Sequence, residues 1–390
     1  MKLLKKVQSL ARQHHKEVVQ IRRSLHQNPE LSFKEFQTCA FIRHQLAAWG
    51  IESDIIAKTG VVAVLKGQNP NSKTIALRAD IDALPIQEIN KFSYRSKNKG
   101  IMHACGHDVH TASLLGVAQI LKQLKEHWQG SIKLIFQPGE EKLPGGASIL
   151  IKEGILENPK PSSILGQHVE PLLEIGKVGI KPGLFMASAD EIYVTVKGKG
   201  GHAAKPHRCV DTVLMAAQLI VQLQQVVSRQ ADPLMPTVLS FGKINSDGGA
   251  TNIIPDQIHL QGTLRTFDEQ WRLKAHGLLQ TQAQLICQSM GGSCDFDIRI
   301  GYPFLQNDEA LTASTKNDMI QYLGSENVVD LPARMGGEDF AFYSQKIPAC
   351  FYRLGVQNPN GTGLHTPNFD INETALETST GLMAWLAMQQ

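Results

Sequence analysis

The chain has 390 residues, of which 42% are hydrophobic and 19% are charged, and its formal net charge is +3. This is the composition of a globular protein long enough for two domains. The small net charge and the lack of Lys/Arg blocks argue against a nucleic-acid-binding protein. No apolar run reaches the length of a membrane span, and the first residues form an amphipathic pattern rather than a signal peptide. The six cysteines lack disulfide spacing, so we expect a cytoplasmic protein.

The first part of the chain alternates between helical and strand patterns. The expected elements, in chain order, are helices at 3–27 and 34–49, strands at 61–65 and 74–77, a helix at 108–127 with Asp108 placed to cap it, a strand at 131–137, a helix at 145–154 and a strand at 163–169. Strands that alternate with helices predict an α/β fold, with a mostly parallel or mixed sheet covered by helices on both faces.

The pattern changes near residue 180. The expected elements are then a strand at 191–197, a helix at 210–229, strands at 236–244 and 256–267, a helix at 268–290 and a strand at 294–301. This βαββαβ order predicts an inserted ferredoxin-like α+β domain. The α/β pattern resumes after Pro303. We therefore predict a catalytic metal-binding domain at 1–181 and 302–390, split around an inserted lid or dimerisation domain at 182–301.

Two segments carry the strongest chemical signal, HACGHD at 103–108 and FQPGEE at 136–141. Cys105 and His107 are two residues apart, a spacing that turns both side chains to one side of an extended segment. Glu140 and Glu141 are adjacent and point different ways, so one can bind a metal while the other acts as a general base. The apolar residues before them predict a buried strand, which places the glutamates just past its C-terminal end, where open α/β sheets bind ligands.

Two further histidines extend this set. His168 lies at the end of another apolar run, and His365 lies in a turn-rich loop near the C-terminus. The candidate ligands are then Cys105, His107, Glu141, His168 and His365. Five ligands are too many for one tetrahedral ion with an open position, and they suit two ions that share a bridging ligand or water. Taken singly, a cysteine can be a small buried hydrophobe and a glutamate pair a solvated face, but the whole set favours a metal site.

On these segments the chain resembles the dinuclear-metal aminoacylase/carboxypeptidase family, in the amidohydrolase subgroup that includes hippurate hydrolase, indoleacetyl-amino-acid hydrolases and N-acetyl-diaminopimelate deacetylase. The resemblance runs from about Arg22 to Leu386, and the Cys-Gly-His segment is specific to this subgroup. It implies that the five candidates bind two divalent ions per subunit (Zn, Mn, Co or Ni) and that Glu140 is the general base. Gly139 stands where alanine is common, and we expect glycine to loosen the turn that aims Glu140.

The resemblance also implies roles for four other residues. Asp80 matches an acidic residue behind the metal site, and His202 matches a histidine that contacts the reacting carbonyl and that the partner subunit can supply in dimeric relatives. Asn252 and Arg265 lie in segments that resemble those holding the substrate's carboxylate. The residues alone leave simpler alternatives open: Asp80 as a cap, His202 as a loop histidine with a local hydrogen bond, Asn252 as a turn residue and Arg265 as a solvent-facing residue. The segment 336–340, GGEDF, matches another family segment.

The predicted reaction is hydrolysis of the amide bond of an N-acyl (acetyl, benzoyl or similar) amino acid. A metal-activated water attacks, and Glu140 carries its proton to the leaving amine. One alternative is a metallo-exopeptidase or dipeptidase on the same scaffold, which Cys105 in its Cys-Gly-His context disfavours. Another is a non-catalytic metal-stabilised binding protein, which an intact Glu140 disfavours. We expect a homodimer formed through the inserted domain and no nucleic-acid or membrane partner. The acyl group, the amino acid and the native metal stay open.

Overall fold

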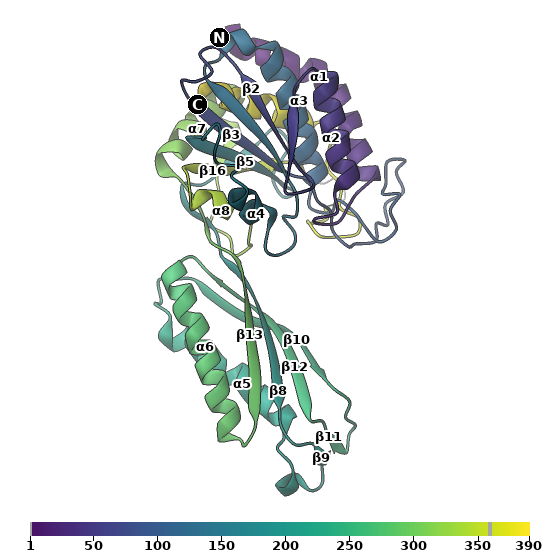
Figure 1. The fold of residues 1–390 in the computed structure, drawn as a ribbon, viewed down its shortest axis with the longest axis vertical. Helices are drawn as coiled ribbons and strands as arrows, with labels where there is room; N and C mark the ends of the chain where they lie inside the picture. The colour runs from purple at the N-terminus through teal and green to yellow at the C-terminus, as the bar shows by residue number, and fades with distance from the viewer. Residues whose placement is uncertain (1, 358–360) are drawn as a thin grey trace. The chain divides into compact units, whose positions relative to one another are not determined.

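The computed structural model describes residues 2–357 and 361–390, which divide into two compact units (Figure 1). Unit 1 consists of the described residues up to Phe185 together with Gln306–Pro332 and Asp339–Gln390. Unit 2 consists of Met186–Leu305 and Ala333–Glu338. Residues 333–338 thus group with unit 2, although they fall in the range predicted for the second part of the catalytic domain.

A mixed sheet forms the centre of unit 1. Among the described residues it has eight strands in the order β1-β2-β4-β3-β5-β16-β6-β15. The strands are β1 (Ser53–Ile56), β2 (Gly60–Lys66), β3 (Thr74–Asp80), β4 (Ser131–Gln137), β5 (Ser163–Glu170), β6 (Val178–Ile180), β15 (Val328–Asp330) and β16 (Ala349–Gly355). The central neighbours β4, β3, β5 and β16 pair in parallel, whereas β1–β2, β2–β4 and β6–β16 pair antiparallel. The four central strands are buried along their whole length, as expected for strands covered on both faces.

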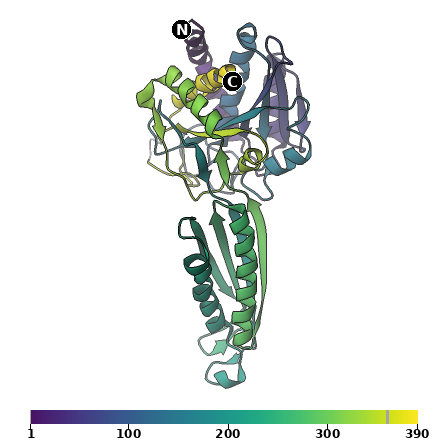
Figure 2. The same ribbon diagram turned by 90° about the vertical axis from the view of Figure 1, so that its left-hand side faces the viewer.

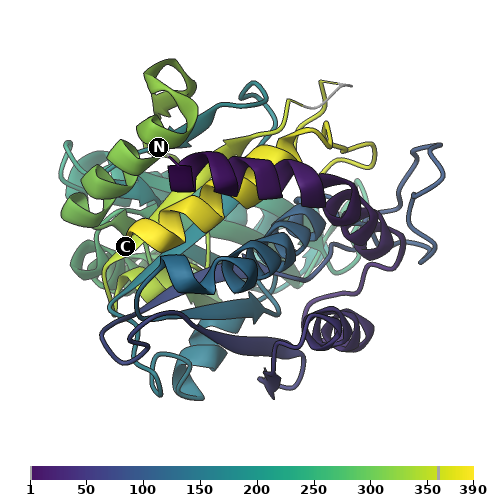
Figure 3. The same cartoon turned by 90° about the horizontal axis from the view of Figure 1, so that it is seen from above.

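Helices cover both faces of this sheet. The helices α1 (Lys2–Gln27), α3 (His107–Gln123) and α9 (Ala375–Gln389) pack against one another over one face, where Leu77, Leu134 and Leu165 join their core (Figure 3). Gly166 follows Leu165 and so turns to the opposite face, where it lies against Phe340. The short helices α4 (Gly146–Lys152) and α8 (Ala341–Ser344) pack together on that side. Helices α2 (Phe36–Ala48) and α7 (Glu309–Leu323) flank α3 and β16 respectively. The predicted α/β fold is confirmed.

Unit 2 is an antiparallel sheet with two helices. Its elements in chain order are β8 (Ala189–Lys197), α5 (Thr212–Gln225), β10 (Thr237–Ser246), β12 (Gln257–Thr266), α6 (Glu269–Ser289) and β13 (Ser293–Tyr302). The strand order is β10-β12-β8-β13, with both helices on one face (Figures 1 and 2). This is the ferredoxin-like arrangement. Ile192, Val194 and Val196 alternate along β8 and bury their side chains against the helices. Two further pairs of short strands are β7 (Gly183–Met186) with β14 (Leu305–Asn307) and β9 (Gly201–His202) with β11 (Ile253–Ile254).

The start of α3 differs from the prediction. Its N-cap residue is Gly106 and no side chain caps it, so the prediction that Asp108 caps this helix is wrong. The buried Asp108 carboxylate instead lies 2.7 Å from Arg22 Nε and 2.8 Å from His26 Nδ1. These contacts anchor α1 to the helix that begins with His107. A buried charge of this kind is tolerated because it is paired and hydrogen-bonded.

None of the helices in the described chain combines the length and the apolar character that crossing a membrane requires.

Candidate metal centre

The five predicted ligands come from four segments of unit 1 that meet beside the C-terminal ends of β4 and β5. Cys105 and His107 lie at the start of α3, Glu141 follows β4, and His168 lies near the end of β5. His365 lies in a loop whose backbone is tied to the first segment, because its N–H donates to the Ala104 carbonyl at 2.8 Å. Segments far apart in sequence therefore reach one place.

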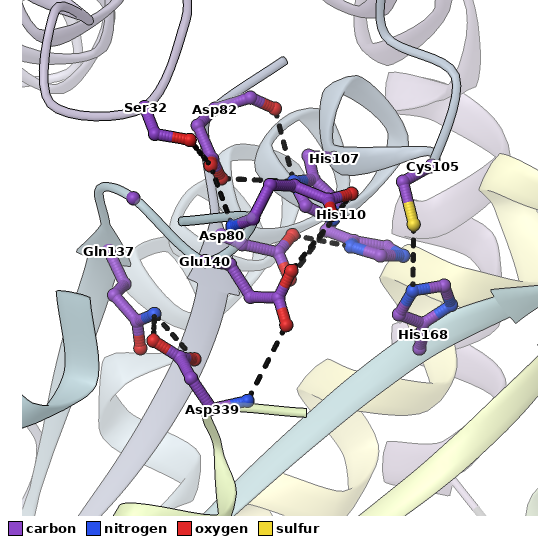
Figure 4. Close-up of polar contacts among 12 residues, drawn as sticks. Ser32, Asp80, Asp82, Cys105, His107, His110, Gln137, Glu140, His168 and Asp339 are labelled. Atoms are coloured by element: carbon purple, nitrogen blue, oxygen red, sulfur yellow. Dashed lines mark hydrogen bonds and ion pairs between the residues drawn. The ribbon is translucent and has the colours of Figure 1, made fainter. Parts of the chain in front are cut away.

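Cys105 contacts two of the predicted histidines, and Figure 4 shows its contact with His168. Its Sγ is 3.4 Å from His168 Nε2 and 3.3 Å from His365 Nε2. Glu141 Oε1 lies 3.3 Å from His365 Nε2 and 3.9 Å from His107 Nε2. Two overlapping triads result, Cys105 with His107 and His168 and Cys105 with Glu141 and His365, and the ligand atoms of each triad lie within 4.8 Å of one another. A thiol common to both triads is the arrangement that a pair of ions with one shared ligand needs.

Hydrogen bonds at Nδ1 fix the ring orientation of two of the candidate histidines, His107 and His168. His168 Nδ1 donates to the Val169 carbonyl at 2.8 Å, and His107 Nδ1 donates to the carbonyl and carboxylate of Asp82 at 3.0 and 3.1 Å. In the neutral form of each ring, Nε2 is then the nitrogen without a proton, and this is the nitrogen that can bind a metal. His107 Nε2 and Glu141 Oε1 are buried and have no hydrogen-bond partner among the described residues. Buried polar atoms without partners are costly, and a cation between them would satisfy both.

The electrostatics of the site favour a cation. Burial, together with the charges of Glu141 and Glu140, raises the pKa of the Cys105 thiol well above its ordinary value. Burial opposes charge on His107, but Asp80 and Asp82 outweigh it and raise the pKa of His107 to about 10. Both shifts report a buried excess of negative charge. A bound divalent ion would offset this excess and let Cys105 bind as the thiolate.

Local backbone geometry brings the segments close. Gly106 has φ +84°, and a Cβ at this position would lie 2.5 Å from a Val169 methyl carbon. Glycine therefore allows the Cys105 segment to approach β5. His365 has φ +61°, a left-handed conformation that costs a residue with a side chain about 1–3 kcal/mol. Strain of this kind is found where the surrounding structure holds a side chain for a function.

Glu140 is buried beside the triads. Its Oε2 lies 4.0 Å from His107 Nε2, and its Oε1 accepts the Asp339 N–H at 3.4 Å. Because Glu140 and Glu141 both face His107, distances alone allow either of them to bind a metal.

The predicted residue Asp80 lies beside His107. Its carboxylate receives hydrogen bonds at 2.6 Å from Arg78 and from His110 Nδ1, and it lies 3.7 Å from His107 Nε2. His110 in turn accepts the Val169 N–H through Nε2. Burial opposes the charge of Asp80, but His107, His110 and Arg78 hold its pKa well below its usual range. Asp80 is therefore an anion that faces the ligand set.

Two acidic residues that the sequence did not single out support the site (Figure 4). Asp82 holds His107 through one carboxylate oxygen and accepts the Glu141 N–H at 3.0 Å through the other. Asp339 is buried, receives Arg78 Nη2 at 2.6 Å and Gln137 Nε2 at 2.8 Å, and donates its own N–H to Glu140. Asp82 is the second acid of the segment RADID at 78–82, and Asp339 lies in the segment GGEDF. Nothing in the sequence connects either residue to its partners.

The other three predicted residues lie in unit 2, at opposite ends of its sheet. His202 pairs with Ile253 in the β9–β11 ladder, and the carbonyl of the neighbouring Asn252 accepts the Ala203 N–H at 2.9 Å. His202 is exposed, and its Nδ1 accepts the Ala204 N–H at 3.1 Å, so Nε2 carries the proton and can donate it. Arg265 is half-buried near the other end of β12, opposite Val238. The structure therefore brings His202 and Asn252 together but not Arg265.

Comparison with known proteins identifies the class of hydrolase that this site defines. Residues 76–389 match the family described as peptidase family M20/M25/M40. An N-acetyl-L-cysteine deacetylase of Bacillus subtilis is 43% identical over 363 residues, which cover 93% of this chain and 85% of that protein. The IAA-amino acid hydrolase ILR1-like 4 of Arabidopsis thaliana is 40% identical over 382 residues, which cover 95% of this chain and 84% of that protein.

A solved structure of a protein from the same family is similar to this chain in both fold and sequence. The crystal structure of the Bacillus subtilis YXEP protein, described as a dinuclear metal binding peptidase from the M20 family, has a TM-score of 0.81 and 35% identity and covers 97% of this chain and 98% of that one. The chain therefore belongs to peptidase family M20/M25/M40, and it is a metal-dependent amide hydrolase.

Proposed function

We propose that this protein hydrolyses the amide bond of N-acyl amino acids, with two divalent ions bound by Cys105, His107, Glu141, His168 and His365. The observation that carries the proposal is the pair of triads that share Cys105, with a second glutamate beside them. The named activities of the relatives, on N-acetyl-L-cysteine and on IAA-amino acid conjugates, support an acylated amino acid as the substrate class. The thiol favours a soft ion such as zinc, although availability can override affinity and leaves Mn, Co and Ni as candidates.

In this proposal the chain's own residues orient the substrate and move one proton. Bound divalent ions would supply Lewis-acid activation of the water and the amide carbonyl. Glu140 removes the proton from the attacking water and passes it to the leaving amine nitrogen. Asp82 orients His107 by accepting its Nδ1–H, and Asp80, held by Arg78 and His110, places its negative charge near His107 Nε2. Arg265 pairs with the amino acid's carboxylate, for which a guanidinium has the matching planar geometry.

A panel of substrates and metals tests this function. Metal-free protein is loaded in turn with Zn²⁺, Mn²⁺, Co²⁺ or Ni²⁺ and assayed with N-acetyl amino acids, N-benzoyl amino acids and dipeptides. We expect hydrolysis of at least one acylated amino acid series, higher kcat/KM than for dipeptides, and loss of activity after chelation that restored metal reverses. Preferential cleavage of dipeptides would instead assign the chain to exopeptidases, and no cleavage with any metal would favour a binding protein.

We further propose that the protein is a homodimer in which His202 and Asn252 serve the partner's active site. Arg265 is eight residues from the first residue of β12, and the His202 end of unit 2 lies beyond that first residue, so roughly 25 Å of strand separates them. A small acylated amino acid cannot contact both ends. We therefore propose that the two ends serve different active sites, with Arg265 acting in its own subunit and His202 in the partner's.

Mixed dimers test the shared site. Glu140→Gln and His202→Ala, each inactive alone, are co-expressed with different affinity tags, and the heterodimer is purified through both. If His202 acts in the partner's site, one of the two sites keeps both native residues, and we expect about half of the wild-type activity per dimer. If His202 acts within its own chain, neither site is intact and the heterodimer is inactive. A protein that sediments as a monomer at assay concentration would also contradict the proposal.

The six cysteines are all free in the described structure, which supports the proposal of a reducing, cytoplasmic location.

A further inference from the structure

Glu35 is a buried carboxylate with no role in the proposed reaction, and it contacts the turn that carries Glu140. Its Oε1 accepts the Gly139 N–H at 2.9 Å and the Phe33 N–H at 2.8 Å, and its Oε2 accepts the Thr59 hydroxyl at 2.8 Å. The Glu35 side chain is fully buried. A buried carboxylate is costly unless its oxygens are hydrogen-bonded. Here three segments of the chain supply the donors, so Glu35 ties them together.

The Gly139 turn is also fixed by Phe33. Gly139 has φ +62°, in the left-handed region, and a Cβ there would lie 2.2 Å from a carbon of the Phe33 ring. The ring therefore lies directly against the glycine backbone, while Glu35 holds the N–H of the same residue. The expectation that Gly139 loosens the turn is wrong. Because glycine has no side chain, the Phe33 ring can pack against its backbone while Glu35 binds its N–H.

The same segment reaches the other side of Glu140 through Asp82. Ser32 Oγ donates to Asp82 Oδ2 at 2.7 Å, and the Glu141 N–H donates to this oxygen at 3.0 Å (Figure 4). Residues 32–35 thus fix the peptide N–H groups before and after Glu140, one directly through Glu35 and one through Asp82. The Glu140 backbone lies between two anchored amides.

We propose that Glu35 is a positioning residue for Glu140, because its carboxyl group fixes the Gly139 N–H and thereby aims the general base at the attacking water. This inference rests on the proposed role of Glu140. Positioning is worth much in catalysis, since a misplacement of about 1 Å can cost about 10²-fold in rate.

Glutamine can reproduce the bonds of Glu35. Burial and the nearby Asp82 raise the pKa of Glu35 to about 7. A neutral side chain at this position keeps Oε1 as the acceptor for Gly139 and Phe33 and can donate to the hydroxyl of Thr59. The turn therefore requires the Oε1 acceptor at residue 35 but not a negative charge. The Glu35→Gln variant removes the charge and keeps the acceptor, so it distinguishes the two contributions.

Kinetics of four variants, each in the metal-loaded protein, test the proposal. We expect Glu35→Ala to lower kcat by about 10–100-fold with little change in KM, as for residues that orient a reacting group without touching the substrate. Glu35→Gln is expected to keep most of kcat. Thr59→Val is the matched control, because it removes one hydrogen bond to Glu35 but leaves the bond to Gly139, so stability falls while kcat does not. If Glu35→Ala does not fold, Glu35→Asp replaces it, since its shorter side chain keeps the charge but withdraws the oxygen from Gly139.

Hydrogen exchange of the metal-free protein gives a second readout that is independent of turnover. The Gly139 amide is expected to exchange faster in Glu35→Ala or Glu35→Asp than in wild type, and at the wild-type rate in Thr59→Val. Wild-type kcat in a variant whose Gly139 amide is deprotected would overturn the proposal, as would a Glu35→Gln variant that loses as much kcat as Glu35→Ala. If the proposed function is wrong, the wild-type protein itself will not hydrolyse acylated amino acids. In that case the hydrogen-exchange rate of the Gly139 amide still shows whether Glu35 holds the turn.

Discussion

Replacement of Glu140 by glutamine is expected to lower kcat by about 10²–10⁴-fold, the usual contribution of general acid–base catalysis. The amide cannot take a proton from water at neutral pH, although it fills the same space. We expect KM to change little, because Glu140 is proposed to act on the attacking water rather than on the bound acyl group. The measurement is steady-state kinetics on the best substrate of the panel, with the metal content of each sample determined in parallel.

The adjacent residue supplies the matched contrast. Glu140 and Glu141 both lie within 4.0 Å of His107 Nε2, so the two side chains compete for the ligand role. Glu140→Gln is expected to retain two metal ions per chain, whereas Glu141→Gln is expected to lose at least one. The reverse pattern of metal content would exchange the two roles and contradict the assignment of the general base.

Replacement of Cys105 by alanine is expected to lower metal occupancy from two ions to one or none per chain. It is expected to lower kcat/KM by about 10²-fold or more, because the charge stabilisation from a catalytic metal is worth several kcal/mol and each 1.36 kcal/mol is a factor of ten. The reason is structural: Cys105 belongs to both triads, so its loss removes a donor from each. Elemental analysis of the purified variant, together with titration of the metal-free protein, measures the effect.

Cys350 provides the control for Cys105. It is also buried, but it lies in β16 within the apolar core rather than among the triads. Cys350→Ala is expected to cost stability without changing metal content, since its loss leaves only a small cavity. Two bound ions in Cys105→Ala would show that the thiol is not a shared ligand.

The candidate site could be located from sequence because its residues follow the ends of strongly apolar segments. Glu141 follows β4, and His168 lies near the end of β5, and short apolar runs in the sequence mark both strands. The C-terminal ends of parallel strands fall at the same edge of the sheet, so the α/β pattern predicted that these candidate ligands lie near one another. His365 could be added as a histidine in a turn-rich loop near the C-terminus, and the resemblance implied the same role.

The residues that support the site could not be found in the same way. Asp108 looked like a helix cap by its position, but Arg22, 86 residues earlier, pairs with it inside the core. Asp339 reaches Arg78 across 261 residues of sequence. Such pairs depend on side chains that meet only in the tertiary structure, and propensity and spacing carry no information about them. Glu35 could not be predicted for the same reason, because a single acidic residue before a helix is common and does not indicate a buried contact.

The distance between His202 and Arg265 within unit 2 could not be predicted from the sequence either. The βαββαβ pattern predicts which strands are neighbours. The separation of His202 from Arg265 depends in addition on the register of β9 with β11 and on the full length of β12. Register is set by packing and turns rather than by the residues of one strand.

Anomalous diffraction from crystals of the metal-loaded protein is the most direct test of the two-metal centre. We expect two peaks about 3.5–4 Å apart, the usual separation in two-metal sites, with Cys105 Sγ bound to both ions, His107 and His168 on one and Glu141 and His365 on the other. A single peak, or peaks whose ligands do not include the Cys105 thiol, would contradict the proposed metal centre and the reaction assigned to it.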